Sequence, residues 1–251
     1  MRIIYEPRGR ALEYAPLAVS LYRGCSHGCR YCFVPAATRT THEAFLSPAP
    51  RKNALNLLER DAADLARDGD EREILMSFTT DPYQPIETEF GLTRAAIEIL
   101  IKYGLHFTIL TKAGLRSVGD IDLLAEHPEL CRYGTSLVFQ SEMARERWEP
   151  FAAPTEDRIA NLSMMHQLGV STWVSCEPVF DTEQTLALIK QTLPFVDEYR
   201  IGKLNHFESD ITQKDYQKFI SDVVWILRPA GKKYVFKKDL LAAARGMAVV
   251  P

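Results

Sequence analysis

Stretches of strand length alternate with stretches of helical period along nearly the whole chain, and this alternation restricts the possible folds strongly. Strands separated by helices are typical of a parallel sheet in an α/β protein. We count six such strand–helix units in the 251 residues. The expected strands cover Leu17–Tyr22, Glu73–Thr79, His106–Lys112, Arg132–Phe139, Ser171–Val179 and Glu198–Asn205.

Each expected strand is followed by a segment with the apolar spacing of an amphipathic helix. Proline and Asp-Thr signals at Ser47-Pro48, Pro154-Thr155 and Asp181-Thr182 indicate helix starts. No low-complexity linker interrupts the pattern, so we expect one domain over residues 1–251 with a short strand–helix extension from about residue 231. The expected helices cover Ser47–Arg67, Thr93–Tyr103, Val118–Leu130, Pro154–Gly169, Thr182–Phe195 and Thr212–Arg228, and the extension comprises the strand Lys233–Lys238 and the helix Asp239–Arg245.

Three cysteines, Cys25, Cys29 and Cys32, lie in one short loop over residues 25–32, directly after the first expected strand. A [4Fe–4S] cluster is normally held by four cysteine thiolates, so three ligands leave one iron free to bind another group. A structural zinc site is the main alternative, and His27 lies in the loop. The paired spacing of zinc motifs is missing, however. The loop therefore predicts an iron–sulfur cluster with an open iron.

The overall charge of −3 excludes a global basic field of the kind that attracts nucleic acid non-specifically. The stretch Gly231–Lys238 interleaves lysines with aromatic residues. It fits either a nucleic-acid contact or an edge strand guarded by lysines. The chain opens without a signal peptide and has no apolar run near the roughly 18 residues needed to span a bilayer. We expect a cytoplasmic protein with no membrane partner.

Polar residues stand at the carboxyl ends of the expected strands, where ligands bind in parallel α/β folds. Because side chains alternate along a strand, Trp173, Ser175 and Glu177 share one face of the fifth strand, and Cys176 lies on the opposite, helix-covered face. Lys203 and Asn205 share a face in the same way. The polar strand-end residues are Thr79, Thr80, Asp81, Thr111, Lys112, Ser136, Glu177, Lys203 and Asn205.

The spacing Cys-x3-Cys-x2-Cys, with Tyr31 before the third cysteine, resembles the signature of the radical SAM superfamily. This resemblance implies a partial (β/α)6 TIM-like barrel, a [4Fe–4S] cluster and S-adenosylmethionine (SAM). It also implies an electron donor such as a flavodoxin or a ferredoxin. Family members cleave SAM to a 5′-deoxyadenosyl radical that takes hydrogen from a substrate. The resemblance implies that SAM contacts Tyr31, Thr80, Asp81, Ser136 and Glu177; Lys203, Asn205 and Lys112 are the candidate catalytic residues.

Several ordered motifs resemble the spore photoproduct lyase-like branch of that superfamily, namely Thr79–Glu87, Leu110–Lys112 and Glu177–Val179. The lyase returns a hydrogen atom through a cysteine and a tyrosine. This chain has Phe33 directly after the third cysteine and Phe78 at the position of the lyase cysteine. Neither side chain has a hydrogen to donate. A relay would need Cys131, Cys176 or a tyrosine such as Tyr83 instead.

The resemblance favours an enzyme of lyase or isomerase type that acts on a thymine-like nucleobase in DNA. A rearrangement of an amino-acid-substituted thymine is one concrete form of this hypothesis. Two alternatives stay open: a radical SAM enzyme for a small metabolite or a protein side chain, and a non-catalytic iron–sulfur module. Oligomeric state does not follow from the sequence. Four histidines share no spacing, and we expect them at the surface or behind the site: His27, His42, His106 and His206.

Overall fold

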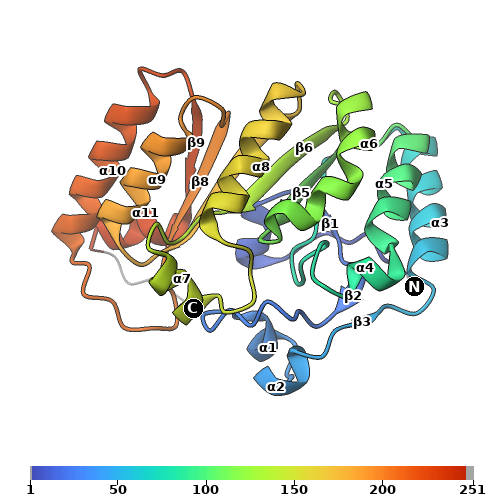
Figure 1. The fold of residues 1–251 in the computed structure, drawn as a ribbon, viewed down its shortest axis with the longest axis horizontal. Helices are drawn as coiled ribbons and strands as arrows, with labels where there is room; N and C mark the ends of the chain where they lie inside the picture. Colours follow the sequence, from blue (N-terminus) through green and yellow to red (C-terminus); the bar gives the residue numbers. More distant parts are fainter. Residues whose placement is uncertain (1, 247–251) are drawn as a thin grey trace.

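The computed structural model describes residues 2–246, so the predicted domain over 1–251 extends beyond the described residues at both ends. Seven parallel strands form the main sheet in the order β1-β4-β5-β6-β7-β8-β9 (Figure 1). Within residues 2–246, β1 and β9 do not pair, so the sheet is open and compatible with a partial barrel. The α/β class predicted from the sequence is confirmed. The strands are β1 Leu17–Val19, β4 Ile74–Met76, β5 Phe107–Thr111, β6 Cys131–Ser136, β7 Ser171–Val179, β8 Glu198–Lys203 and β9 Lys233–Phe236.

Helices follow the strands along the chain (Figure 1). Their buried apolar side chains belong to the same core cluster as those of the strands. Asp181 caps one of them by accepting from two backbone N–H groups, and Thr212 with Asp215 forms a capping box on another. No helix among residues 2–246 is long and apolar enough to cross a membrane. The helices are α3 Ala54–Arg67, α5 Leu92–Lys102, α6 Ile121–Glu126, α8 Thr155–Gln167, α9 Thr182–Thr192, α10 Gln213–Leu227 and α11 Lys238–Ala244.

Strand alternation separates the core from the site as expected. Val174 and Cys176 lie in the large core between sheet and helices, whereas Trp173 packs in a smaller cluster on the opposite face. Ser175 and Glu177 line a cavity. Cys131 and Cys176 are both buried core residues. The edge-strand interpretation of Gly231–Lys238 is confirmed, because β9 pairs with β8 at one end of the sheet.

The first expected strand, Leu17–Tyr22, was too long, because β1 ends at Val19 and Tyr22 pairs in a separate two-stranded sheet. Two expected helices were also wrong. The predicted helix start at Ser47 fails because β3, Ala49–Pro50, pairs antiparallel with β2, Tyr22–Arg23, and α3 begins only at Ala54. The predicted helix Val118–Leu130 is a 3-10 helix, Gly114–Asp120, followed by the short α6. Shorter elements fill the connections: a 3-10 helix Gly9–Glu13, α1 Val34–Ala37, α2 His42–Phe45, α4 Glu87–Phe90 and α7 Glu142–Trp148.

Candidate active site

A cavity of about 460 Å³ lies at the carboxyl ends of the central strands. It collects side chains from the cysteine loop and from the ends of β4, β5, β6, β7 and β8. All eleven residues that the sequence analysis assigned to the cluster, to SAM or to catalysis line it. They are Cys25, Cys29, Tyr31, Cys32, Thr80, Asp81, Lys112, Ser136, Glu177, Lys203 and Asn205. The parallel topology thus brings residues that are far apart in the chain to one surface.

The cysteine loop is held from two sides by backbone hydrogen bonds. Cys25 donates to the carbonyl of Phe45 in α2 (2.8 Å), and Arg30 donates to the carbonyl of Trp148 in α7 (2.9 Å). The N–H of Phe151 donates back to the carbonyl of His27 (3.2 Å). The loop therefore has a defined shape that depends on segments far along the chain.

The three cysteines are free thiols that all reach the cavity. Burial raises the pKa of each thiol, that of Cys25 to about 12, and the charge of the Lys112 ammonium opposes this rise at all three. Cluster binding therefore has to release protons from these thiols. Among residues 2–246, no three acidic, histidine or cysteine side chains converge as a single ion requires. A cluster spreads its cysteines over separate irons and does not need that convergence.

Asp81 connects the end of β4 to the cysteine loop and to β5. Its carboxylate accepts from the Thr111 hydroxyl (2.7 Å), the Lys112 N–H (2.7 Å) and the Tyr83 N–H (2.9 Å), and it lies 3.3 Å from Nδ1 of His27. Burial alone would raise the pKa of Asp81, but the interaction with His27 and the hydrogen bonds from Lys112 and Thr111 together hold the pKa below its usual range. The carboxylate thus has four partners within the chain.

His27 departs from the expectation that the histidines lie at the surface or behind the site. The side chain is only 2% exposed, and the ring lines the cavity. Its Nε2 lies 3.1 Å from Nη2 of Arg116, while Nδ1 faces Asp81. His27 is therefore a structural partner of Asp81 inside the cysteine loop. Its position between the first two cysteines was the available sequence signal.

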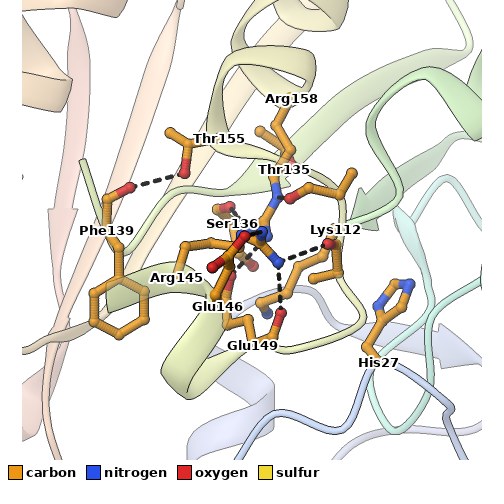
Figure 2. Close-up of polar contacts among 12 residues, drawn as sticks. His27, Lys112, Thr135, Ser136, Phe139, Arg145, Glu146, Glu149, Thr155 and Arg158 are labelled. Atoms are coloured by element: carbon orange, nitrogen blue, oxygen red, sulfur yellow. Dashed lines mark hydrogen bonds and ion pairs between the residues drawn. The ribbon is translucent and has the colours of Figure 1, made fainter. Parts of the chain in front are cut away.

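Figure 2 shows a buried ion pair between Glu149 and Arg158. Glu149, at the end of α7, and Arg158, in α8, are 0% and 1% exposed, and Glu149 Oε2 lies 2.7 Å from Arg158 Nη2. The hydroxyl of Tyr31 donates to the same carboxylate. Arg158 also donates to the carbonyl of Ser136 (3.0 Å), which joins the pair to the end of β6. The pair anchors the cysteine loop to the sheet.

Sequence reasoning missed this ion pair. The only signal was weak: Glu149 is the single charged residue in the run Trp148–Pro154. The charge network does explain the position of Tyr31, whose hydroxyl is occupied while its ring lines the cavity. Lys112 completes the arrangement, because its ammonium lies 5.8 Å from the centre of the Tyr31 ring.

A second network surrounds Glu177 at the end of β7. The hydroxyl of Tyr14 hydrogen-bonds to Glu177, and it lies 3.0 Å from Oγ of Ser175. The ammonium of Lys237 is 3.8 Å from Glu177 and 3.3 Å from the centre of the Tyr14 ring. Burial lowers the pKa of Lys237 to about 8. Sequence reasoning did not identify Tyr14 or Lys237, because they precede and follow the strand–helix units.

Lys203 and Asn205 reach the cavity from the end of β8, as the shared strand face predicted. The ammonium of Lys203 donates to the carbonyl of Leu204 (2.9 Å), and the amide of Asn205 donates to the carbonyl of Lys203 (3.2 Å). Both side chains share the cavity with Glu177. The structure therefore brings these three polar groups together around one space.

Phe33 and Phe78 meet at the cavity wall, with ring centroids 5.7 Å apart. Phe78 also contacts Tyr14, at 5.8 Å. The three residues considered as substitute hydrogen donors do not line the cavity: Cys131 donates to the carbonyl of Leu124, Cys176 lies in the core, and Tyr83 is buried. An apolar aromatic surface therefore occupies the two relay positions.

The profile of the Radical SAM superfamily matches residues 19–193. An uncharacterized protein of Methanocaldococcus jannaschii is 25% identical over 193 residues, which are 76% of this chain and 71% of that protein. An uncharacterized protein of Mycobacterium tuberculosis is 30% identical over 183 residues, or 69% of this chain and 52% of the relative. The chain thus spans about half the length of the mycobacterial relative.

A radical SAM Nα-GlyT isomerase of Pseudomonas phage M6 is 25% identical over 158 residues, which are 62% of this chain and 31% of the phage protein. Among solved structures, spore photoproduct lyase complexed with dinucleoside spore photoproduct has a TM-score of 0.72 at 13% identity and covers 92% of this chain and 79% of its own. Streptococcus suis SuiB bound to S-adenosylmethionine has a TM-score of 0.69 at 13% identity, with 93% and 53% coverage. At these identities the structural likeness concerns the fold.

Proposed function

The chain belongs to the radical SAM superfamily, and on this basis we propose that it takes hydrogen from a thymine-like base in DNA and rearranges that base. Membership makes it an enzyme that uses a [4Fe–4S] cluster and SAM. The substrate and the outcome of the reaction are the proposed parts.

We assign the cluster to Cys25, Cys29 and Cys32, whose thiols share one cavity wall. For SAM the same cavity offers the ring of Tyr31 and the polar side chains of Thr80, Ser136 and Glu177, while Asp81 holds the cysteine loop through His27. The bound cluster and SAM supply a 5′-deoxyadenosyl radical that abstracts hydrogen, once a one-electron donor has reduced the cluster. We assign substrate contacts to Lys203 and Asn205. Lys112, the third candidate catalytic residue, lies between the cysteines and Tyr31.

The contact between Phe33 and Phe78 carries the proposal about the reaction outcome. A phenol and a thiol at these two positions would form a hydrogen relay, but here two hydrocarbon rings pack together at 5.7 Å. Neither ring has an O–H or S–H bond. The two phenols that line the cavity, Tyr14 and Tyr31, each donate to a carboxylate. This arrangement favours return of the abstracted hydrogen atom from 5′-deoxyadenosine, as an isomerisation requires.

Two comparisons support the substrate class. The phage relative at 25% identity is named as an isomerase of Nα-GlyT. The lyase with a similar fold was solved with a dinucleoside spore photoproduct. Together with the missing relay, they favour a thymine-derived base and a rearrangement over repair of a thymine dimer.

Deuterium transfer tests this function. The anaerobically reconstituted protein would be incubated with SAM, dithionite and oligonucleotides that contain deuterated thymine, either unmodified or amino-acid-substituted. We expect the abstracted deuterium to be divided between the 5′-methyl group of deoxyadenosine and a product isomeric with the substrate, in which part of the deuterium is replaced by hydrogen from that methyl group, with one oligonucleotide class preferred. The Cys29→Ala variant serves as the control without a complete cluster. Formation of 5′-deoxyadenosine at the same rate with and without every oligonucleotide would refute the proposal.

A further inference from the structure

A second hollow, of about 390 Å³, adjoins the main cavity. It lies between the β2–β3 ribbon, the α1–α2 segment and the loop after β4. The two spaces share four lining residues: Val34, Phe45, Thr79 and Thr80. A molecule in the main cavity could therefore extend a group into this hollow.

Two arginines face the hollow from the ribbon. Arg23 ends β2 opposite Ala49, and Arg51 follows β3, with its N–H bonded to the carbonyl of Leu21 (2.8 Å). Within residues 2–246, neither guanidinium has a carboxylate at ion-pair distance. Burial and the charge of Arg23 lower the pKa of Arg51. Two cations thus stand close together without an anion to compensate them.

Most of the donors of Arg51 point to no protein group. Its Nε donates to the carbonyl of Tyr22 (3.2 Å), and no bond within residues 2–246 uses its two terminal nitrogens. A guanidinium has five N–H donors in a fixed plane, suited to the oxygens of a phosphate. The single Nε bond fixes the plane and leaves the outer edge free for such an anion.

Hydroxyl groups complete the lining. Thr40, Ser47, Thr79 and Thr80 all border the hollow. At its base is Gly24, with φ +76°, where a Cβ atom would lie 2.7 Å from the carbonyl oxygen of Phe45. The chain is therefore closely packed there and no side chain enters the space from this residue. Hydroxyl and guanidinium donors around a small space are the usual chemistry of phosphate contacts.

We propose that this hollow binds a phosphate group of the substrate, held by Arg23 and Arg51, while the attached base lies in the main cavity. The inference rests on the proposed nucleobase substrate and adds the position of its backbone. The chain as a whole carries a charge of −3, so phosphate attraction has to come from such a local pair of cations.

Binding measurements with three probes test the site: oligothymidylate of twelve nucleotides, thymidine 5′-monophosphate and thymidine. The variants are Arg23→Gln, Arg51→Gln and their combination. Arg228→Gln, an exposed arginine that ends α10, is the control for the loss of one charge. SAM binding and the melting temperature of each variant report whether the fold and the main cavity are intact.

For each arginine removed, we expect about tenfold weaker binding of the oligonucleotide. The slope of log affinity against log salt should fall by about 0.7 per lost contact with a single-stranded phosphate. Thymidine and SAM binding should not change, and Arg228→Gln should bind like the wild type.

The outcomes separate this inference from the proposed function. One outcome is that the wild type does not bind the oligonucleotide but binds thymidine 5′-monophosphate more tightly than thymidine, and that the variants lose this preference. The phosphate site is then supported, and DNA is not the substrate. If the variants bind every probe with wild-type affinity and salt slope, the phosphate site is refuted, whether or not DNA is the substrate.

Discussion

The carboxylate of Asp81 lies 3.3 Å from the imidazole Nδ1 of His27, which ties the loop of cluster cysteines to the end of β4. The same carboxylate accepts from Thr111 and from the Lys112 N–H at 2.7 Å. One buried side chain thus sets the relative position of three segments that line the cavity.

We therefore expect Asp81→Asn to loosen the cysteine loop. An amide cannot accept all of these bonds, and the loss of hydrogen bonds to a charged group should destabilise the fold by about 3 kcal/mol. The free energy of unfolding of the apoprotein, measured with urea, and the iron content after reconstitution should both decrease. Asp122→Asn, which removes an exposed partner of Arg94, is the matched control with little expected effect. Equal iron content in both variants would argue against the positioning role.

The ion pair between Glu149 and Arg158 should behave as a buried pair. Glu149→Gln leaves the Arg158 charge, 1% exposed, without its partner, which should cost about 3–5 kcal/mol of unfolding free energy. It should also weaken the hydrogen bond from the Tyr31 hydroxyl, which would donate to a neutral amide oxygen in place of a carboxylate, and reduce iron retention. Glu146→Gln, on the exposed side of α7, should change little. A double variant with Arg158→Gln should recover part of the loss, because the uncompensated charge is gone.

The cysteines divide into two classes. Replacing Cys25, Cys29 or Cys32 by alanine should remove most of the bound iron and its visible absorption, because each thiolate holds a separate iron. Cys131→Ala and Cys176→Ala should keep the iron, since both side chains lie in the core. These two variants should instead lose some stability through small cavities. Iron loss in Cys176→Ala without unfolding would contradict the assignment.

Restoring the missing donors should change the fate of the hydrogen atom. In the double variant Phe33→Tyr and Phe78→Cys, a phenol and a thiol would stand where the two rings now meet at 5.7 Å. We expect a fraction of product formed in D2O to gain solvent deuterium, and the rearranged product to decrease. Phe90→Tyr, an exposed residue of α4, is the control. Solvent deuterium in the wild-type product would show that another donor already acts.

Lys237 should give the protein a distinctive pH dependence. Burial lowers its pKa to about 8, whereas an unfolded lysine titrates near 10.4. Between these values the unfolded chain binds the extra proton, so stability rises with pH across this window. Relative to Lys237→Met, the wild type should gain about 3 kcal/mol of unfolding free energy from pH 8 to pH 10.5. If the unfolding free energy of the two proteins changes with pH in the same way, the lowered pKa of Lys237 is contradicted.

Local patterns were sufficient for the general fold and for the chemistry. Strand alternation separated Glu177 from Cys176 correctly, because side-chain direction has a period of two along any strand. Topology then explains why polar strand ends gather: carboxyl ends of parallel strands share one edge of a sheet. The wrong helix start at Ser47 has the opposite cause, since its Ser-Pro signal was overridden by pairing of Pro50 with Tyr22, a partner 28 residues earlier.

The sequence alone thus determined the α/β fold, the three cysteines of the cluster loop and the absence of donors at Phe33 and Phe78. These features are encoded by neighbouring residues or by strand and helix periods. Only the tertiary structure decided that Glu149 supports Tyr31 from 118 residues away, that His27 is buried against Asp81, and that Arg23 and Arg51 face one hollow. Such contacts depend on the packing of whole elements against each other, which no local spacing records.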